Sequence, residues 1–264
     1  MSVAPSMKNV RIHFVRGANI LRKLFRSSSY KLATKVEGHT LNSHALTRSF
    51  IAGRKAREND DRYMYHVRKP QAKAAFSFAI DFSGSMSSGI GSGTDPLLGS
   101  RSDTWTRVLA TIHGMTAVAD SVGISSKVGF VQFERSETED SQFQSIIIKD
   151  WTDKPWNDEY ASRLAQLSPN SGTNCADYAR ASLYMLEGVN AEHKVAFFLT
   201  DGEDHWSRDY YRSLDELAKS MRIKLVGIAF SMDKGLKDVL PNGCVVKNTK
   251  ELGEVIFKHL ENLF

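Results

Sequence analysis

The chain has 264 residues, of which 41% are hydrophobic and 25% are charged, so it can bury the core of one large globular domain. No hydrophobic run approaches the roughly 18 residues of a membrane span, and the first residues lack the apolar centre of a secretory signal. The two cysteines, Cys175 and Cys244, have no Cys-x-x-Cys spacing, which excludes a disulfide framework and favours reduced thiols. We therefore expect a cytoplasmic protein without a membrane partner.

The charge of the chain is unevenly distributed. Residues 1–73 contain 16 Lys and Arg against 4 Asp and Glu, a net charge of +12, whereas residues 74–264 contain 19 against 26, a net charge of −7. Together they account for the net charge of +5. Such an asymmetry fits a nucleic-acid partner, an acidic protein partner, or attraction between the two parts of the chain.

The first 73 residues form the basic N-terminal extension, which we expect to be partly helical. Between Lys8 and Phe25 the residues Ile20, Leu21, Leu24 and Phe25 would share one face of a helix, and 41–52 could form a second, short helix. We expect this extension to dock partly on the rest of the chain, with 41–52 as its anchored part and the first 30 residues looser. The lack of any acidic residue before Glu37 also fits an organellar transit peptide, an alternative that we consider less favoured.

From residue 74 onward, strand-like and helix-like segments alternate, which predicts a doubly wound α/β domain over 74–264 with a mostly parallel sheet flanked by helices. Several strands are apolar at nearly every position, as in strands buried on both faces. The predicted strands are Ala75–Ile80, Val128–Phe133, Phe143–Trp151, Val195–Thr200, Lys224–Phe230 and Cys244–Lys247.

Helical spacing of apolar residues and capping residues predict the helices between these strands. One begins after Asp103 and ends near Gly123, one runs from Cys175 to about Leu186 with Asn174 as its cap, and two more cover Tyr210–Met221 and Glu251–Leu263. His113, inside the first, has no partner residues of a metal site beside it and is expected to be structural. The Gly- and Ser-rich stretch 87–101 is longer than a usual strand-to-helix connection and is expected to form a rim.

Five oxygen-bearing side chains follow the predicted strands or precede a helix: Asp81, Ser83, Ser85, Thr173 and Asp201. Asp81 and Asp201 each come directly after an apolar strand, and ligands of doubly wound sheets bind beyond these carboxyl ends. Carboxylates and hydroxyls are hard ligands, which suit Mg2+ or another divalent cation such as Mn2+. Taken alone, Asp-x-Ser-x-Ser could also be a turn with capping hydroxyls.

The order Asp-x-Ser-x-Ser, then Thr, then Asp resembles the metal-ion-dependent adhesion site (MIDAS) of von Willebrand factor A domains, and all five positions are present. This resemblance implies that the five residues ligate the metal and that one open position accepts an acidic residue of a protein partner. Met86, the rim and Trp206 would then surround the contact, although Trp206 could equally be a core residue.

Upstream of this motif, the segments 37–46 and 62–65 resemble the approach to the A domain in the CobT-type subunit of cobaltochelatase and in CobT-like chains of phages and bacteria. The sequence departs from the bacterial chelatase subunits in lacking their long acidic segment. The resemblance implies an AAA+ ATPase partner of the MoxR or CobS type, in a bacterial cell or a phage-infected host.

Enzymatic motifs are missing from the sequence. It contains no Gly-x-x-x-x-Gly-Lys-Ser/Thr loop for ATP, no His-Glu-x-x-His and no Gly-x-Ser-x-Gly. Only Glu203, Asp204 and His205 lie where a general base could assist the metal, and a solvated loop is the simpler interpretation. The sequence thus favours a non-catalytic, metal-dependent interaction subunit, with a stand-alone binding protein whose basic arm engages nucleic acid or a phage structural component as the alternative.

Overall fold

The computed structural model describes Phe14 and the residues 17–25, 74–87, 104–134, 142–170, 175–201, 208–230, 242–246 and 249–264. The chain divides into two compact units, Met1–Phe25 with Lys73–Phe264, and Arg26–Ala72. All described residues belong to the first unit. The predicted helix at 41–52, most of the rim, Thr173 and 202–207 lie outside the described residues.

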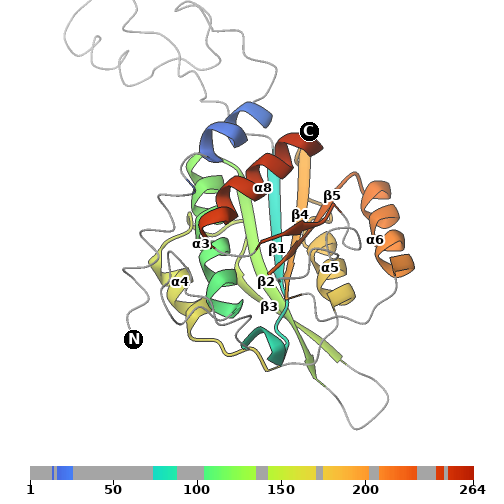
Figure 1. The fold of residues 1–264 in the computed structure, drawn as a ribbon. Helices are drawn as coiled ribbons and strands as arrows, with labels where there is room; N and C mark the ends of the chain where they lie inside the picture. The colour runs from blue at the N-terminus through green and yellow to red at the C-terminus, as the bar shows by residue number, and fades with distance from the viewer. Residues whose placement is uncertain are drawn as a thin grey trace, which may run out of the picture. The chain divides into compact units, whose positions relative to one another are not determined.

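Six strands form one sheet in the order β3-β2-β1-β4-β5-β6 (Figure 1). All neighbouring strands are parallel except β2 and β3, which are antiparallel. The strands are β1 Ala74–Ile80, β2 Ser125–Glu134, β3 Gln142–Lys149, β4 His193–Thr200, β5 Lys224–Ala229 and β6 Cys244–Val245. Each predicted strand is therefore present, and the predicted doubly wound, mostly parallel α/β class is confirmed.

The helices cover both faces of this sheet. They are η2 Gly84–Ser87, a short 3-10 helix, and α3 Thr104–Ser121, α4 Asp158–Ala165, α5 Cys175–Tyr184, α6 Arg208–Ser220 and α8 Thr249–Leu263. In Figure 1, α3 and α8 lie together on one side of the sheet and α5 and α6 on the other. Between β4 and these last two helices, Ala196 and Phe198 share a hydrophobic cluster with Leu183 of α5 and Leu214 of α6.

One strand end and one helix differ clearly from the sequence prediction, and several other element ends differ by one to three residues. The strand predicted for Phe143–Trp151 ends at Lys149, because the backbone N–H of Asp150 donates to the Asp153 carboxylate at 2.8 Å and turns the chain. The α4 helix was not predicted, although Asn157 caps it by accepting from the backbone N–H groups of Glu159 and Tyr160. The signal for α4 was this cap followed by acidic residues, and the helix is too short for a clear hydrophobic period.

The described part of the N-terminal extension is helical and built into the core. Phe14, Ala18, Leu21 and Phe25 are at most 6% exposed, and their spacing places them on one helical face. The rings of Phe25 and Phe76 of β1 meet edge to face at 5.4 Å. The helical prediction is therefore confirmed for 17–24, but the expectation that the first 30 residues are the looser part is wrong for these residues.

Glycine at two positions allows this close packing. A Cβ on Gly17 would lie 1.9 Å from the ring of Phe257 in α8, and one on Gly114 of α3 would lie 2.4 Å from the ring of Phe14. The segment thus lies against both helices on one side of the sheet. The buried face of this helix therefore differs from the predicted one: Leu21 and Phe25 are buried as predicted, but Ile20 and Leu24 are only half-buried.

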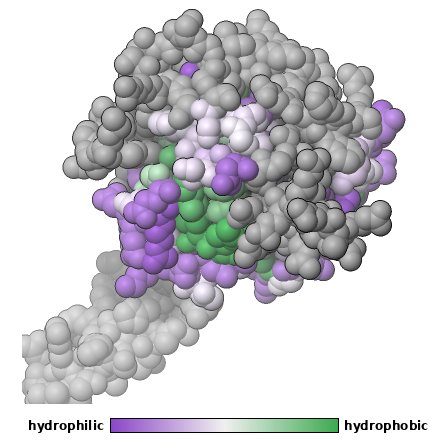
Figure 2. All heavy atoms as spheres, turned by 90° about the horizontal axis from the view of Figure 1, so that it is seen from below, coloured by the Kyte–Doolittle hydropathy of each residue, from purple (hydrophilic) through white to green (hydrophobic). Residues whose placement is uncertain are grey.

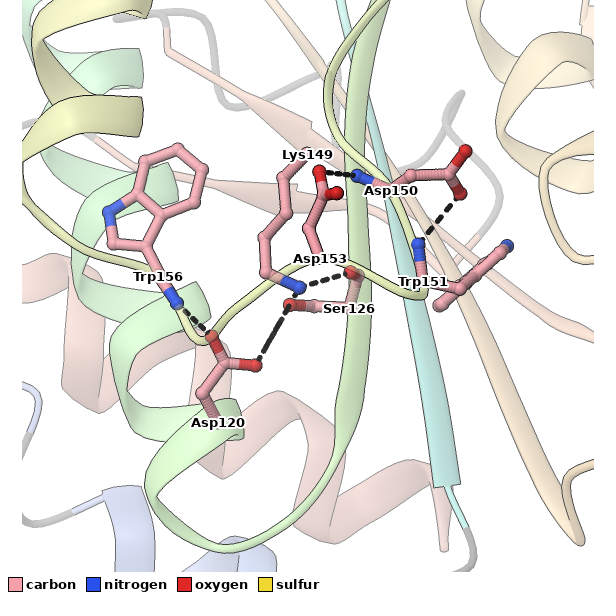
Figure 3. Close-up of polar contacts among 7 residues, drawn as sticks. All are labelled: Asp120, Ser126, Lys149, Asp150, Trp151, Asp153 and Trp156. Carbon is pink, nitrogen blue, oxygen red and sulfur yellow. Dashed lines mark hydrogen bonds and ion pairs between the residues drawn. The ribbon is translucent and has the colours of Figure 1, made fainter.

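A network of polar contacts lies at the end of β3 (Figure 3). The ammonium group of Lys149 donates to the carbonyl oxygen of Ser126 at 2.7 Å and lies 3.9 Å from the Asp120 carboxylate. Asp120 also accepts from the backbone N–H of Trp156 at 2.5 Å. These contacts attach the segment that leads to α4 to the end of α3, next to a register shift at Val128 and Gly129 of β2.

Two further predictions concern single residues. His113 is buried and accepts a hydrogen bond at Nδ1 from the indole N–H of Trp156, at 3.0 Å, so it is a structural histidine as predicted. Cys244 is a buried free thiol. Among the described helices, none combines the length and the hydrophobicity that crossing a membrane requires.

Candidate metal centre

The two predicted carboxylates lie at the point where the strand order of the sheet reverses. Asp81 directly follows β1 and Asp201 directly follows β4, and these parallel strands are neighbours, with Ile80 paired to Leu199. The chain leaves β1 toward β2 on one side and β4 toward β5 on the other. This reversal is the usual ligand position of doubly wound sheets, beyond the carboxyl ends of the strands. The backbone N–H of Asp81 extends the pairing by donating to the Leu199 carbonyl at 2.8 Å.

The loop after β1 gathers three oxygen-bearing side chains. The backbone N–H of Ser83 donates to Asp81 Oδ1 at 2.8 Å, and the hydroxyls of Ser83 and Ser85 lie 2.9 Å apart. The backbone N–H of Met86 then donates to the Ser83 carbonyl as η2 begins. The alternating Asp-x-Ser-x-Ser pattern therefore places its polar side chains on one side of a tight turn, as the metal-site interpretation requires.

Burial differs between these residues in an informative way. Asp81 and Ser83 are fully buried and Asp201 is 3% exposed, whereas Ser85 is half-buried. Met86 is also fully buried, which corrects the expectation that its side chain contributes to a contact surface. Its thioether belongs to the core beneath η2, because the 3-10 turn directs it inward.

The electrostatics of the site disfavour the ionised form of Asp81 next to Asp201. Burial, and after it the charge of Asp201, raises the pKa of Asp81 from 3.8 to about 6, although hydrogen bonds from Ser83 and Thr200 act in the opposite direction. Thr200 Oγ1 donates to Asp81 Oδ2 at 2.9 Å. Sequence reasoning did not select Thr200, and its signal was a polar residue directly after the apolar run 195–199 at the end of β4.

The residues present fit a hard divalent cation. In the part of the chain that the structure describes, no three His, Cys, Asp or Glu side chains form a metal-binding group, so a bound ion would depend on hydroxyls and water in addition to two carboxylates. That donor set suits Mg2+ or Mn2+ better than a soft metal. A dication near Asp81 and Asp201 would also offset the repulsion between the two carboxylates, which adds to burial in raising the pKa of Asp81.

The structure describes most, but not all, of the predicted site residues. Four of the five predicted ligands, Asp81, Ser83, Ser85 and Asp201, are brought to one end of β1 and β4. Thr173 lies outside the described residues, and α5 begins two residues after it at Cys175. Glu203, Asp204, His205 and Trp206 also lie outside them.

The end of the molecule that carries η2 shows a mixed surface. Seen from this end, the described residues show a hydrophobic area with hydrophilic side chains along part of its edge (Figure 2).

Comparison with known proteins yields a likeness of fold. No family model and no curated protein sequence matches the chain. Among solved structures, the chain is similar to a D319A mutant of the PilB minor pilin from Streptococcus sanguinis, with a TM-score of 0.50, 15% identity, and coverage of 76% of this chain and 63% of that one.

Two other similar structures have lower scores. BatB from Bacteroides thetaiotaomicron has a TM-score of 0.46 and 14% identity, with 72% of this chain and 98% of that chain covered. A von Willebrand factor type A protein from Catenulispora acidiphila has a TM-score of 0.43 and 17% identity, with 70% and 41% covered. The strand order and pairing define the chain as a doubly wound α/β protein with a mostly parallel sheet, and von Willebrand factor A domain proteins are among the structures similar to it.

Proposed function

We propose that this chain is a non-catalytic protein-interaction subunit of the von Willebrand factor A type, whose binding depends on Mg2+ or a similar divalent cation held by Asp81, Ser83, Ser85, Thr173 and Asp201. The observation that carries the proposal is the convergence of Asp81 and Asp201, with the two serines, at the reversal of strand order. The ordered motif in the sequence supports the same assignment.

The proposed binding mode uses an acidic residue of the partner. Asp81 and Asp201 balance the two charges of the cation, and the hydroxyls add no charge. A position left to water could then accept a carboxylate from the partner. Charge-assisted contacts of this kind are directional, and their loss leaves a desolvated carboxylate on the partner.

The proposed partner is an AAA+ ATPase of the MoxR or CobS type. Support for it comes from the segments 37–46 and 62–65, which resemble CobT-like chains, and from the lack of a phosphate-binding loop in this sequence. In this role ATP hydrolysis belongs to the partner, and a chelatase-like task of the complex is one form of the proposal.

The experiment is an affinity pull-down with the purified chain and a co-encoded AAA+ ATPase, with Mg2+ and with EDTA. We expect binding in Mg2+ that is lost in EDTA and in the Asp201→Ala variant. Asp209→Ala is the matched control, because this carboxylate lies on α6 with a side chain 85% exposed. Association that survives both EDTA and Asp201→Ala would refute the metal-dependent mechanism.

The alternative function is a stand-alone binding protein whose basic arm engages nucleic acid or a phage structural component. The net charge of +12 in residues 1–73 favours it. Nucleic-acid binding through this arm would weaken steeply with salt, because bound counterions are released. No binding to duplex or single-stranded DNA or RNA at low salt would exclude the nucleic-acid form of this alternative.

A further inference from the structure

The strand β3 forms one edge of the sheet. In the strand order β3-β2-β1-β4-β5-β6 it pairs with β2, and no other described strand pairs with it. About half of the backbone N–H and C=O groups of an edge strand point away from its single neighbour, where they can pair with another chain. β3 therefore offers a row of hydrogen-bonding groups that the described part of the sheet does not use.

The sequence of β3 leaves most of this edge without the features that usually block strand pairing. Charged side chains, prolines and bulges are the common means of blocking an edge. The stretch 142–147 contains neither a charged residue nor a proline. Such features occur only after it, because the register shifts between Ile147 and Lys149 and the Lys149 ammonium group points inward to the Ser126 carbonyl. The open part of the edge is thus 142–147.

Part of this edge extends beyond β1. The pairing of β1 with β2 ends at Ile80 and Phe130, whereas β2 continues along β3 to the pair of Glu134 and Gln142. β2 and β3 therefore project as a two-stranded ribbon past the end of β1, where Asp81 follows (Figure 1). The open edge is at the end of the sheet that carries the proposed metal centre.

Beside the other end of the open edge the surface is apolar. Ile147 is 38% exposed, and Tyr184, the last residue of α5, is 53% exposed. A Cβ on Gly129 would lie 2.9 Å from Ile147 Cδ1 and 2.8 Å from Met185 Cε, so these two side chains cover Gly129 together. A segment added to β3 would therefore place alternate side chains on the same face as an exposed isoleucine.

Acidic residues flank the uncharged stretch on both sides. From the end of β2 to the start of β3, residues 134–141 contain four acidic residues and one arginine, a net charge of −3. After β3, residues 150–154 contain two acidic residues and one lysine, a net charge of −1, and the side chain of Asp150 is 49% exposed. Lys149 does not offset these charges, because it is buried beside Asp120. A strand that fits this edge is therefore uncharged in its middle and basic at its ends.

We propose that the edge 142–147 of β3 is a second contact surface of this chain, which binds an extended, basic segment of a protein partner by strand addition. Main-chain hydrogen bonds supply the affinity in this binding mode, and side chains at alternate positions supply the specificity. The contact needs no cation, so it goes beyond the proposed metal-dependent function. A second copy of this chain fits less well, since pairing of two β3 strands brings acidic flanks against acidic flanks.

The test uses the full-length chain and a synthetic peptide in which valine and threonine alternate between lysines at both ends. One control peptide has glutamates in place of the lysines, and another has an N-methyl group on every central residue, which removes the backbone donors. We expect the lysine peptide to bind in calorimetry, equally with Mg2+ and with EDTA. Each control should bind about tenfold more weakly or not at all, because one lost hydrogen bond alone can cost about tenfold.

Variants of the chain locate the binding. Ile147→Lys places a positive charge at the edge and should weaken binding of the lysine peptide about threefold to tenfold. Asp150→Asn removes a flanking charge and keeps an acceptor for the Trp151 N–H, and it should weaken binding about twofold to fivefold. Asn262→Lys is the control, because it adds the same charge at an exposed position of α8, and it should bind like the parent.

Hydrogen exchange shows where the peptide lies. The outward-facing amides of 142–147 should exchange rapidly in the free chain and slowly with the lysine peptide. If all of these amides are already protected in the free chain, another part of the chain covers the edge and the proposal is wrong. It is equally wrong if the lysine peptide does not bind, or if Ile147→Lys binds it like the parent.

Two further outcomes separate this proposal from its rivals. A concentration-dependent dimer in sedimentation that Ile147→Lys abolishes would identify a second copy as the occupant and overturn the basic partner. If the parent binds Mg2+ but not the lysine peptide, the edge proposal is wrong and the metal centre stands. If Asp81→Ala binds Mg2+ like the parent while the lysine peptide still protects 142–147, the metal centre is wrong and the edge proposal is supported.

Discussion

Replacing Asp81 by Asn should stabilise the metal-free protein while abolishing its metal binding. Asn is nearly isosteric, and its side-chain oxygen can still accept from the Ser83 N–H, while its amide can donate to Thr200 Oγ1 once that hydroxyl turns. The substitution removes the buried charge and its repulsion with Asp201, which together raise the pKa of Asp81.

The size of the effect follows from that pKa. The value is about 6 in the folded protein against 3.8 for the free side chain, and each pKa unit corresponds to about 1.4 kcal/mol, so the charged form costs about 3 kcal/mol. Because the pKa of Asp81 is raised on folding, the metal-free parent keeps its full stability below about pH 4, where Asp81 is protonated. It loses about 3 kcal/mol as the pH rises to about 6 and Asp81 ionises. At pH 7.5 the Asn variant should therefore melt roughly 6 to 12 °C above the metal-free parent.

Thermal and urea unfolding with EDTA at pH 4 and pH 7.5 measures this difference. The advantage of Asp81→Asn should be present at pH 7.5 and nearly absent at pH 4, where Asp81 of the parent is protonated. With Mg2+ at about 100 times its dissociation constant, the parent should gain about 3 kcal/mol and the variant nothing. An equal stability difference at both pH values would refute the assignment of a buried carboxylate that is repelled by Asp201. Asp209→Asn is the control, because this side chain is exposed, and it should leave the stability unchanged at both pH values.

Other predictions concern the core. Lys149→Met should destabilise the fold by about 3 kcal/mol in urea unfolding, because it leaves the Asp120 carboxylate, whose side chain is only 11% exposed, without its counter-charge; adding Asp120→Asn should restore much of this loss, and full additivity of the two changes would contradict the ion-pair explanation. Phe25→Ala should cost about 3 to 5 kcal/mol, since its ring is 1% exposed and meets Phe76; no measurable loss would show that the segment 17–25 is not part of the core in solution. Gly17→Ala should lower the melting temperature, because its Cβ would overlap the ring of Phe257, and an unchanged melting temperature would contradict this close approach.

The alternation of apolar strands and amphipathic helices was sufficient to predict the fold class. All six strands were located because runs such as 75–80 and 195–200 are apolar at nearly every position, which is typical of strands covered on both faces. The antiparallel direction of β3 did not follow from its sequence, because strand direction depends on the connection to β2 and not on side-chain type. The short α4 helix was missed because its sequence offers only a capping residue and no clear hydrophobic period.

The candidate site shows the same division. That Asp81 and Asp201 end strands could be predicted from sequence, and so could the hydroxyls that accompany them. That β1 and β4 are neighbours, and that Thr200 donates to Asp81, are properties of the sheet order. That β3 is an edge strand is also a property of this order, and no local pattern marks it.

The sequence by itself determined the elements of this protein and the chemistry of its polar loops, because both depend on residue types at short spacing. Only the tertiary structure decided which strands lie side by side, that the carboxylates of Asp81 and Asp201 interact, and that the basic N-terminal segment contributes Phe14, Leu21 and Phe25 to the core. From the sequence we expected the first 30 residues to be the looser part of the basic extension. Burial of the apolar face of this segment against β1 and α8 overrides that expectation, since lysine and arginine on the opposite face of a helix can remain in water while the apolar face packs.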